Sequence, residues 1–171
     1  MKNIMVAGIV AGLLAFSTAA MAEVGFQFGV PVMATQNDSK LDAGSAGTSV
    51  MITLDLDQTL TVGFLNENMR GKEGGADYTS NLTGLRLHKT ISDPFYIGVG
   101  LGNAVVTGAK TVNAPVADIL MGGKFFPSKG KLSAYISAEV GYRMMKTNGA
   151  ANAAVTDYSG IRTALAVGIS F

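Results

Sequence analysis

The last part of the chain alternates hydrophobic and polar positions without a break. From Ile161 onward one face is apolar, and the other carries Arg162 followed by small residues. The later apolar positions are Leu165, Val167, Ile169 and Phe171. A period of two over this length is typical of a β-strand with one hydrophobic face. The pattern therefore predicts a strand that ends on an aromatic residue.

Seven earlier segments alternate in the same way. The expected strands are Val24–Val32, Ser49–Asp57, Thr59–Met69, Tyr78–Thr90, Phe95–Val105, Val116–Phe126, Leu132–Met144 and Tyr158–Phe171. Short connections near 57–58, 92–94 and 127–131 alternate with longer ones at 33–48, 70–77, 107–115 and 145–157. An even strand number with short and long connections in turn is typical of bacterial membrane barrels. The sequence predicts an all-β, eight-stranded antiparallel up-and-down transmembrane β-barrel.

The mean hydropathy of +0.32 is high, yet no long apolar run follows residue 22. In lipid, every backbone N–H and C=O needs a partner, which a closed barrel supplies. We therefore expect the apolar face of each strand to contact lipid and the polar face to line the lumen. A soluble periplasmic barrel, with these two faces exchanged, is an alternative.

The amino terminus predicts a cleaved signal peptide over residues 1–22. A basic start at Met1–Asn3 precedes an apolar run from Ile4 to Phe16, and Ala20-Met21-Ala22 forms a small-x-small cleavage site. The apolar run is shorter than the roughly 20 residues that a membrane-spanning helix needs. We expect residues 23–171 to form the barrel domain. The chain has no cysteine, which excludes a disulfide and a lipid-modified cysteine.

The charge balance argues against nucleic acid as a partner. The chain has 13 Lys and Arg against 12 Asp and Glu, so removal of Lys2 with the leader leaves 12 of each. Nucleic-acid binding favours a basic face. A neutral chain is therefore expected to have other partners.

Several charged residues, among them the three arginines Arg86, Arg143 and Arg162, fall on the face that we assign to the lumen. Arg or Lys facing lipid at mid-membrane would cost about 2–4 kcal/mol. Counting through the hairpins places Arg162 opposite Glu139, and Asp118 near Glu139 and diagonal to Arg143. We expect one cluster of Asp118, Glu139, Arg143 and Arg162, and a second that joins Arg86 and His88 to Asp55 and Asp57. Glu67 and Lys124 share the inward parity.

The favoured interpretation of these charges is a plug of paired ions, because buried charges must be paired. Gly98, Gly100 and Gly102 on the fifth strand leave space for the long side chains. An eight-stranded barrel is just wide enough for side chains to fill it. The alternative is a narrow path for water or small solutes, since the inward face is rich in glycine.

No motif for catalysis, a metal or a cofactor emerges. His88 is the single histidine, and one histidine without cysteine cannot build a transition-metal site. Lipopolysaccharide-modifying enzymes of this fold place their catalytic residues toward the outer face, and the string His88-Lys89-Thr90 lacks their His-x-Ser signature. We therefore expect no enzymatic activity, with a lipid A-modifying enzyme as the less favoured alternative.

The whole chain after residue 22 resembles the small eight-stranded outer-membrane proteins of the OmpA, OmpX and opacity-protein type. The leader through Ala22, the alternating strands and the ending Leu165-x-Val-x-Ile-x-Phe171 carry the resemblance, and the ending is similar to the assembly signal of such barrels. The resemblance implies a monomer in the cell outer membrane that contacts lipid and lipopolysaccharide. It also implies periplasmic chaperones and the barrel-assembly machinery as partners. Because this fold hosts unrelated roles, we expect a structural or surface-interaction role.

Overall fold

The computed structural model describes residues 23–39, 41, 44–126, 132–147 and 156–171. The expected leader, residues 1–22, and the expected turn at 127–131 lie outside the described residues. Within the described residues, no helix is long and apolar enough to cross a membrane.

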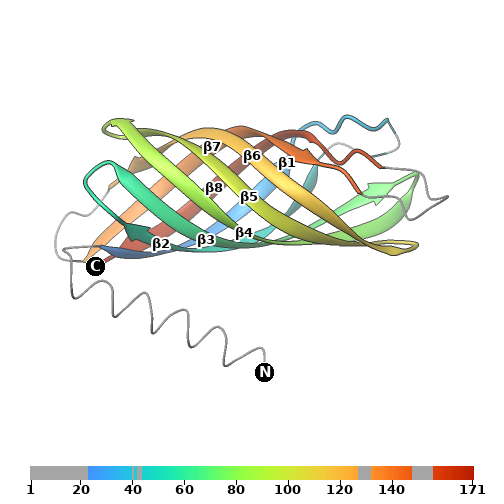
Figure 1. The fold of residues 1–171 in the computed structure, drawn as a ribbon, viewed down its shortest axis with the longest axis horizontal. Coiled ribbons are helices and arrows are strands. Elements are labelled where there is room, and N and C mark those ends of the chain that lie inside the picture. Colours follow the sequence, from blue (N-terminus) through green and yellow to red (C-terminus); the bar gives the residue numbers. More distant parts are fainter. Residues whose placement is uncertain (1–22, 40, 42–43, 127–131, 148–155) are drawn as a thin grey trace, which may run out of the picture.

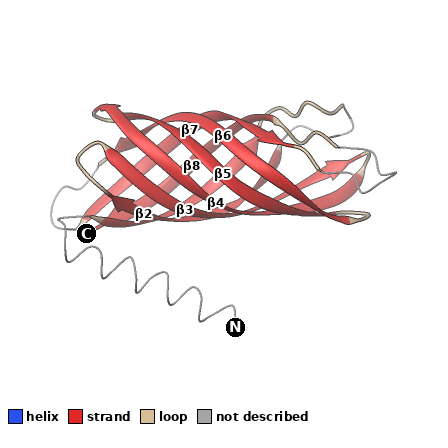
Figure 2. Ribbon diagram, in the orientation of Figure 1, coloured by secondary structure: helices blue, strands red, loops and turns tan. Residues whose placement is uncertain are grey.

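Eight antiparallel strands close into one barrel in chain order (Figures 1 and 2). They are β1 (Val24–Met33), β2 (Ser45–Asp55), β3 (Leu60–Glu73), β4 (Ala76–Ser92), β5 (Phe95–Thr107), β6 (Thr111–Phe125), β7 (Ser133–Met145) and β8 (Gly160–Ser170). The predicted all-β, eight-stranded antiparallel barrel is therefore confirmed. Each predicted segment corresponds to one strand, with ends that differ by a few residues.

The first and last strands form the seam that closes the barrel. Their pairing runs from Gly25 opposite Ser170 to Met33 opposite Arg162. The backbone N–H of Val24 donates to the carbonyl of Phe171 over 3.1 Å, and the N–H of Phe171 donates back over 3.0 Å. Closure leaves no unpaired strand edge, which is the condition for a barrel in lipid.

Two hairpins are longer than the sequence pattern predicts. The expected loops at 70–77 and 107–115 are wrong, because β3 pairs with β4 up to Glu73–Ala76 and β5 pairs with β6 up to Thr107–Thr111. Gly74 and Gly75 form the first turn with φ of 58° and 84°, a conformation that glycine adopts without strain. Figure 1 shows both hairpin tips at the end of the barrel opposite the C terminus.

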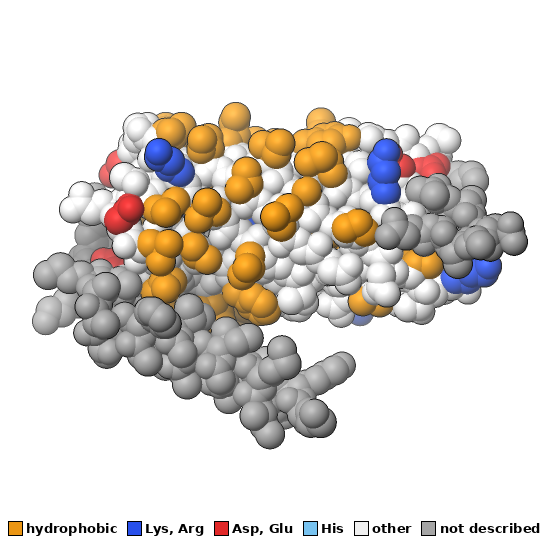
Figure 3. All heavy atoms as spheres, in the orientation of Figure 1, with side chains coloured by type: hydrophobic (Ala, Val, Ile, Leu, Met, Phe, Trp, Pro, Cys, Tyr) orange, Lys and Arg blue, Asp and Glu red, His pale blue; other side chains and the backbone are white. Residues whose placement is uncertain are grey.

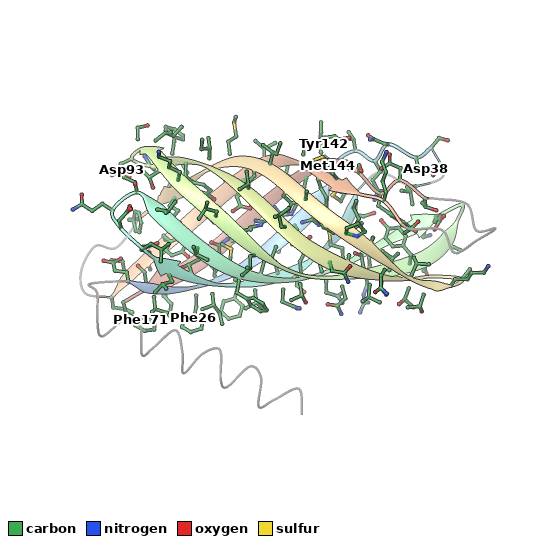
Figure 4. The ribbon with its side chains drawn as sticks, viewed as in Figure 1. Phe26, Asp38, Asp93, Tyr142, Met144 and Phe171 are labelled. Carbon is green, nitrogen blue, oxygen red and sulfur yellow. The ribbon has the colours of Figure 1, made fainter. Side chains whose placement is uncertain are left out.

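We call the end that carries Phe171 and the connections after β2, β4 and β6 the turn end. The other end, with the connections after β1, β3, β5 and β7, is the loop end. Figure 4 shows Asp93 and Phe171 at the turn end and Asp38 at the loop end. These two names give the level of each side chain along the barrel.

The outer surface of the barrel is apolar across its middle. Along β5 the exposed fraction is 51% for Val99 and 72% for Leu101, and along β8 it is 65% for Leu165. Figure 3 shows hydrophobic side chains over the middle of the wall in view, with charged side chains toward its two ends. The apolar faces point outward, so the alternative of a soluble barrel with those faces inside is wrong.

Candidate functional site

The lumen holds six charged side chains that alternate in sign. They come from five strands and each is at most 6% exposed. The members are Glu67, Arg86, Asp118, Glu139, Arg143 and Arg162. All six occupy positions whose parity points inward, which is why the alternation of each strand delivers them to the lumen.

These six residues form a closed cycle that we call the ion ring. Arg143 contacts Asp118 through Nε and Oδ1 at 2.8 Å, and its Nη1 donates to Glu67. Arg86 contacts Asp118 at 3.0 Å and Glu139 at 2.8 Å. Arg162 completes the cycle, at 2.7 Å from Glu67 and 3.1 Å from Glu139. Every arginine bridges two carboxylates, and every carboxylate bridges two arginines.

The ion ring allows six charged side chains to be buried inside a narrow barrel. Three positive and three negative groups sum to zero within it. An unpaired buried charge would be costly, whereas a guanidinium between two carboxylates is both paired and hydrogen-bonded. The ring occupies the lumen that an eight-stranded barrel offers to side chains. A cavity lined in part by Arg86 and Asp118 measures about 10 Å³, at the lower limit for one water molecule.

The structure brings the four residues of the first predicted cluster together, but in a different register. Asp118 lies directly opposite Arg143, and Glu139 lies opposite Gly122 and Ala164. The expected placements of Arg162 opposite Glu139 and of Asp118 diagonal to Arg143 are therefore wrong. Arg162 still reaches Glu139 because a long side chain spans a shift of two residues.

The second predicted group does not form. Arg86 belongs to the ion ring, where its partners are Asp118 and Glu139 rather than Asp55 or Asp57. Asp55 accepts a hydrogen bond from the hydroxyl of Thr61 on the adjacent strand at 2.5 Å. Asp55 and Asp57 therefore form contacts near the turn end and take no part in the ion ring.

Glu67 is the ring member that sequence reasoning did not assign. Its side chain has no measurable exposure and it accepts from both Arg143 and Arg162. Glu67 lies on β3, and its partners lie on β7 and β8, so the contacts cross the lumen. Strand adjacency carries no information on such contacts. The available signal was a charge count, since three inward arginines require a third deeply placed carboxylate.

Asp57 closes the turn between β2 and β3. Its Oδ1 accepts from the backbone N–H of Thr59 at 2.6 Å, from the Thr59 hydroxyl at 2.9 Å and from the N–H of Leu60 at 2.8 Å. These bonds, the one from the Thr59 backbone first, lower the pKa of Asp57 below its ordinary value of 3.8. An aspartate that caps the following backbone is a common turn device.

His88 lies between the ion ring and the turn end. Its ring is 3% exposed and stacks on Tyr96, with centroids 4.8 Å apart. The Tyr96 hydroxyl donates to Glu139 at 2.9 Å and so ties this layer to the ring. Neither ring nitrogen of His88 has a hydrogen-bond partner among the described residues. The contact between a base and a hydroxyl nucleophile that acyl-transfer chemistry needs is therefore not formed in this part of the chain.

A polar vestibule opens the lumen at the turn end. Its volume is about 860 Å³. His88 and Tyr96 line its inner part, with Asp55 and Lys124, and the turn residues Asp57 and Asp93 line its mouth. No group of three or more metal-binding side chains occurs in the described residues. The vestibule is thus a pocket at the turn end, and one of its lining residues, Tyr96, contacts the ion ring through Glu139.

A buried cluster that we call the apolar cap lies in the barrel toward the loop end. Leu41, from the connection after β1, is 7% exposed and packs in a buried cluster with Tyr78 and Tyr158. The Tyr78 hydroxyl accepts from Gln36 at 2.8 Å, and Glu73 accepts from Tyr158 at 2.8 Å. The connections after β1 and β7 and the β3–β4 hairpin are thereby tied over the same end. Charged side chains of the ion ring thus fill the middle of the lumen, and apolar side chains of the cap fill it toward the loop end.

The predicted assembly-signal residues share the outward face of the last strand. The exposed fractions are 65% for Leu165, 59% for Val167, 43% for Ile169 and 48% for Phe171. The ring of Phe171 stacks on Phe26 across the seam, with centroids 6.0 Å apart (Figure 4). The aromatic end of the chain therefore sits on the outer surface where the barrel closes.

The comparisons with known proteins support the fold. No protein-family model and no curated protein matches this chain. The crystal structure of Neisserial surface protein A (NspA) superposes with a TM-score of 0.51 at 11% identity, over 87% of this chain and 95% of that one. The solid-state NMR structure of outer membrane protein AlkL in lipid bilayers gives 0.44 at 12% identity, over 88% of each. This chain is a small eight-stranded β-barrel structurally like NspA.

Proposed function

We propose that this protein is a monomeric integral protein of the cell outer membrane, with a closed lumen and a structural or surface-interaction role. The observation that carries the closed lumen is the ion ring, in which all six charges are engaged across the barrel. The apolar cap around Leu41 adds a second barrier at the loop end. The turn end then faces the periplasm and the loop end faces outward.

The membrane location is supported by the surface of the barrel. Exposed large hydrophobic residues such as Leu101 and Leu165 would face water in a soluble protein, and extended exposed apolar surface marks a membrane or partner contact. Heat-modifiable gel migration after detergent extraction of the membrane fraction tests this. A folded band that runs apart from the boiled one is expected. Recovery of the folded protein from the soluble periplasmic fraction would contradict the location.

Single-channel recording in planar bilayers tests the closed lumen. The wild-type protein is expected to give no steady conductance above bilayer leak, because ions must pass both the ion ring and the apolar cap. The control is the same sample after heat denaturation. Sustained conductance from the folded protein would support the narrow pore for water or small solutes instead.

The proposal includes the absence of lipid A modification. Cells that express the wild-type protein and cells that express His88→Ala are expected to show the same lipid A mass profile as cells without the protein. A mass difference that disappears in the variant would support the enzyme alternative. Proposed partners are outer-membrane lipid and lipopolysaccharide, together with the periplasmic chaperones and the assembly machinery that deliver such barrels.

A further inference from the structure

The outward side chains of β4 to β8 form two parallel rows across the barrel wall. Pairing between neighbouring strands sets both rows. The first row runs Lys89, Ile97, Met121 and Val140. The second row runs Leu87, Val99, Ile119, Tyr142 and Ile161. All members of the second row and three of the first are hydrophobic, so a cation stands at one end of an otherwise apolar pair of rows.

An apolar groove lies along these rows. Its volume is about 670 Å³, and its lining comprises the side chains of both rows with Gly98, Leu120 and Gly141. These three residues occupy inward-facing positions between the outward rows, so the strand backbone forms the floor of the groove. In Figure 4, Tyr142, a member of the second row, projects outward from the wall, as does Met144 two residues further along β7. The groove therefore opens to the surroundings of the barrel and not to the lumen.

The groove climbs along the barrel from the turn end toward the loop end. Lys89 is three residues from the last residue of β4, whereas Tyr142 is nine residues from the first residue of β7. Six further residues along a strand tilted by about 40° correspond to about 15 Å of height. The hydrocarbon core of a bilayer is about 30 Å thick, so one leaflet is about 15 Å. The groove spans the depth of one leaflet.

Lys89 marks the end of the groove at which a headgroup would lie. Its side chain is exposed, it projects from the outward face of β4, and no ion pair joins it to any described carboxylate within 4.0 Å. A lysine near the edge of an apolar surface extends its ammonium group to the membrane interface. A phosphate group complements that charge.

We propose that the groove binds one phospholipid of the periplasmic leaflet, with its phosphate on Lys89 and an acyl chain between the two rows. This inference rests on the proposed location in the membrane and adds a defined lipid site to it. The site takes a phosphodiester headgroup with a long acyl chain. Charge complementarity at Lys89 and the match between groove height and leaflet depth favour this occupant.

Native mass spectrometry of lipid-loaded protein tests the site. The protein is reconstituted in vesicles of phosphatidylethanolamine and phosphatidylglycerol in equal amounts, then extracted in a mild detergent. The wild type is expected to retain one phospholipid per barrel. Lys89→Gln is expected to lower the retained fraction about fivefold, the effect of one basic residue at an anionic lipid surface. Val99→Phe, which fills the groove, is expected to lower it at least as much.

Two matched variants serve as controls. Val167→Phe makes the same change at an outward valine of similar exposure outside the groove, and Lys110→Gln removes an exposed lysine at the loop end. Both are expected to retain lipid as the wild type does. Equal losses in a control and its matched variant would overturn the proposal, as would a loss in Lys89→Gln with none in Val99→Phe.

Heat-modifiable migration of the same samples separates this inference from the proposed function. A barrel that folds and enters the vesicles but retains no phospholipid overturns the groove alone. A chain that folds but stays outside the vesicles overturns the membrane location as well.

Discussion

Arg143 and Asp118 face each other across β6 and β7 and are joined by two nearly parallel hydrogen bonds. The first runs from Nε to Oδ1 over 2.8 Å and the second from Nη2 to Oδ2 over 3.0 Å. Such fork-shaped contacts are the strongest and most directional pairs that arginine makes. Since Arg86 also donates to Asp118, this carboxylate holds two of the three guanidinium groups of the ion ring.

Asp118→Asn is expected to lower the free energy of unfolding by about 3–5 kcal/mol, because it leaves an uncompensated positive charge in the lumen. Urea unfolding of the protein in lipid vesicles, followed by gel migration, measures the change. The control is Asp157→Asn, which removes the partner of Lys146 at an exposed ion pair of 3.2 Å. That variant is expected to lose no more than about 1 kcal/mol. Similar losses in the two variants would mean that the ring contributes no more than a surface pair.

His88→Phe is expected to change the free energy of unfolding by less than about 1 kcal/mol, in either direction. The substitution removes two ring nitrogens that have no described partner, so no hydrogen bond to a described residue is lost, and it keeps a ring to stack on Tyr96. The vestibule beside it has room for the larger ring. The same unfolding assay measures this. Arg86→Met, two residues along the same inward face, is the comparison and is expected to be strongly destabilising.

Replacing Gly122 or Gly100 with alanine tests how much space the lumen leaves for a Cβ at each position. A Cβ at Gly122 would lie 2.6 Å from the Tyr96 hydroxyl and 2.7 Å from the backbone oxygen of Ala138. At Gly100 it would lie 3.3 Å from side-chain atoms of Arg86 and Asp118. We expect Gly122→Ala to cost about 1–3 kcal/mol and to displace Tyr96 from Glu139, and Gly100→Ala to cost less. A larger loss at Gly100 in the unfolding assay would contradict this order.

The turn at Asp57 is expected to loosen in acid. The hydrogen bonds from Thr59 and Leu60 hold the pKa of Asp57 below 3.8, so the carboxylate stabilises the turn above that pH. The stabilisation is lost as the pH falls through the lowered pKa. The amide signal of Thr59, followed by NMR, should titrate with a midpoint below 3.8 and should not titrate in Asp57→Asn. A midpoint at or above 3.8 would show that the bonds to Oδ1 are not maintained.

The number of strands and the face of each side chain could be predicted from the sequence, because lipid and lumen impose opposite polarities on alternate residues. The signal weakens where the outward face is also polar. Asn68 pairs with Asn81 and Arg70 with Thr79 on the outer surface near the loop end. Apolar and polar residues do not alternate in these parts of β3 and β4, so their sequence has the pattern of a loop.

Contacts across the lumen could not be predicted in the same way. Parity identifies which charges are inside, but the choice of partner depends on barrel diameter, strand stagger and side-chain length. Arg86 illustrates the limit, since its sequence position suggests Asp55 and Asp57 as partners across the third strand, and its actual partners lie on β6 and β7. For the same reason, parity and charge count place Glu67 inside the barrel but do not identify its partners on β7 and β8.

The ion ring also determines when water can leave the lumen during assembly of the barrel. Its hydrogen bonds join residues separated by at least 23 and by as many as 95 positions along the chain, and those of Glu67 and Arg86 join strands that are not neighbours in the barrel. Arg162 arrives on the last strand, and until it does Glu67 and Glu139 each lack one of their two guanidinium partners. An incomplete sheet must therefore keep water around these acids. Expulsion of that water has to wait for the seam between β1 and β8, which makes dehydration of the interior the final event of assembly.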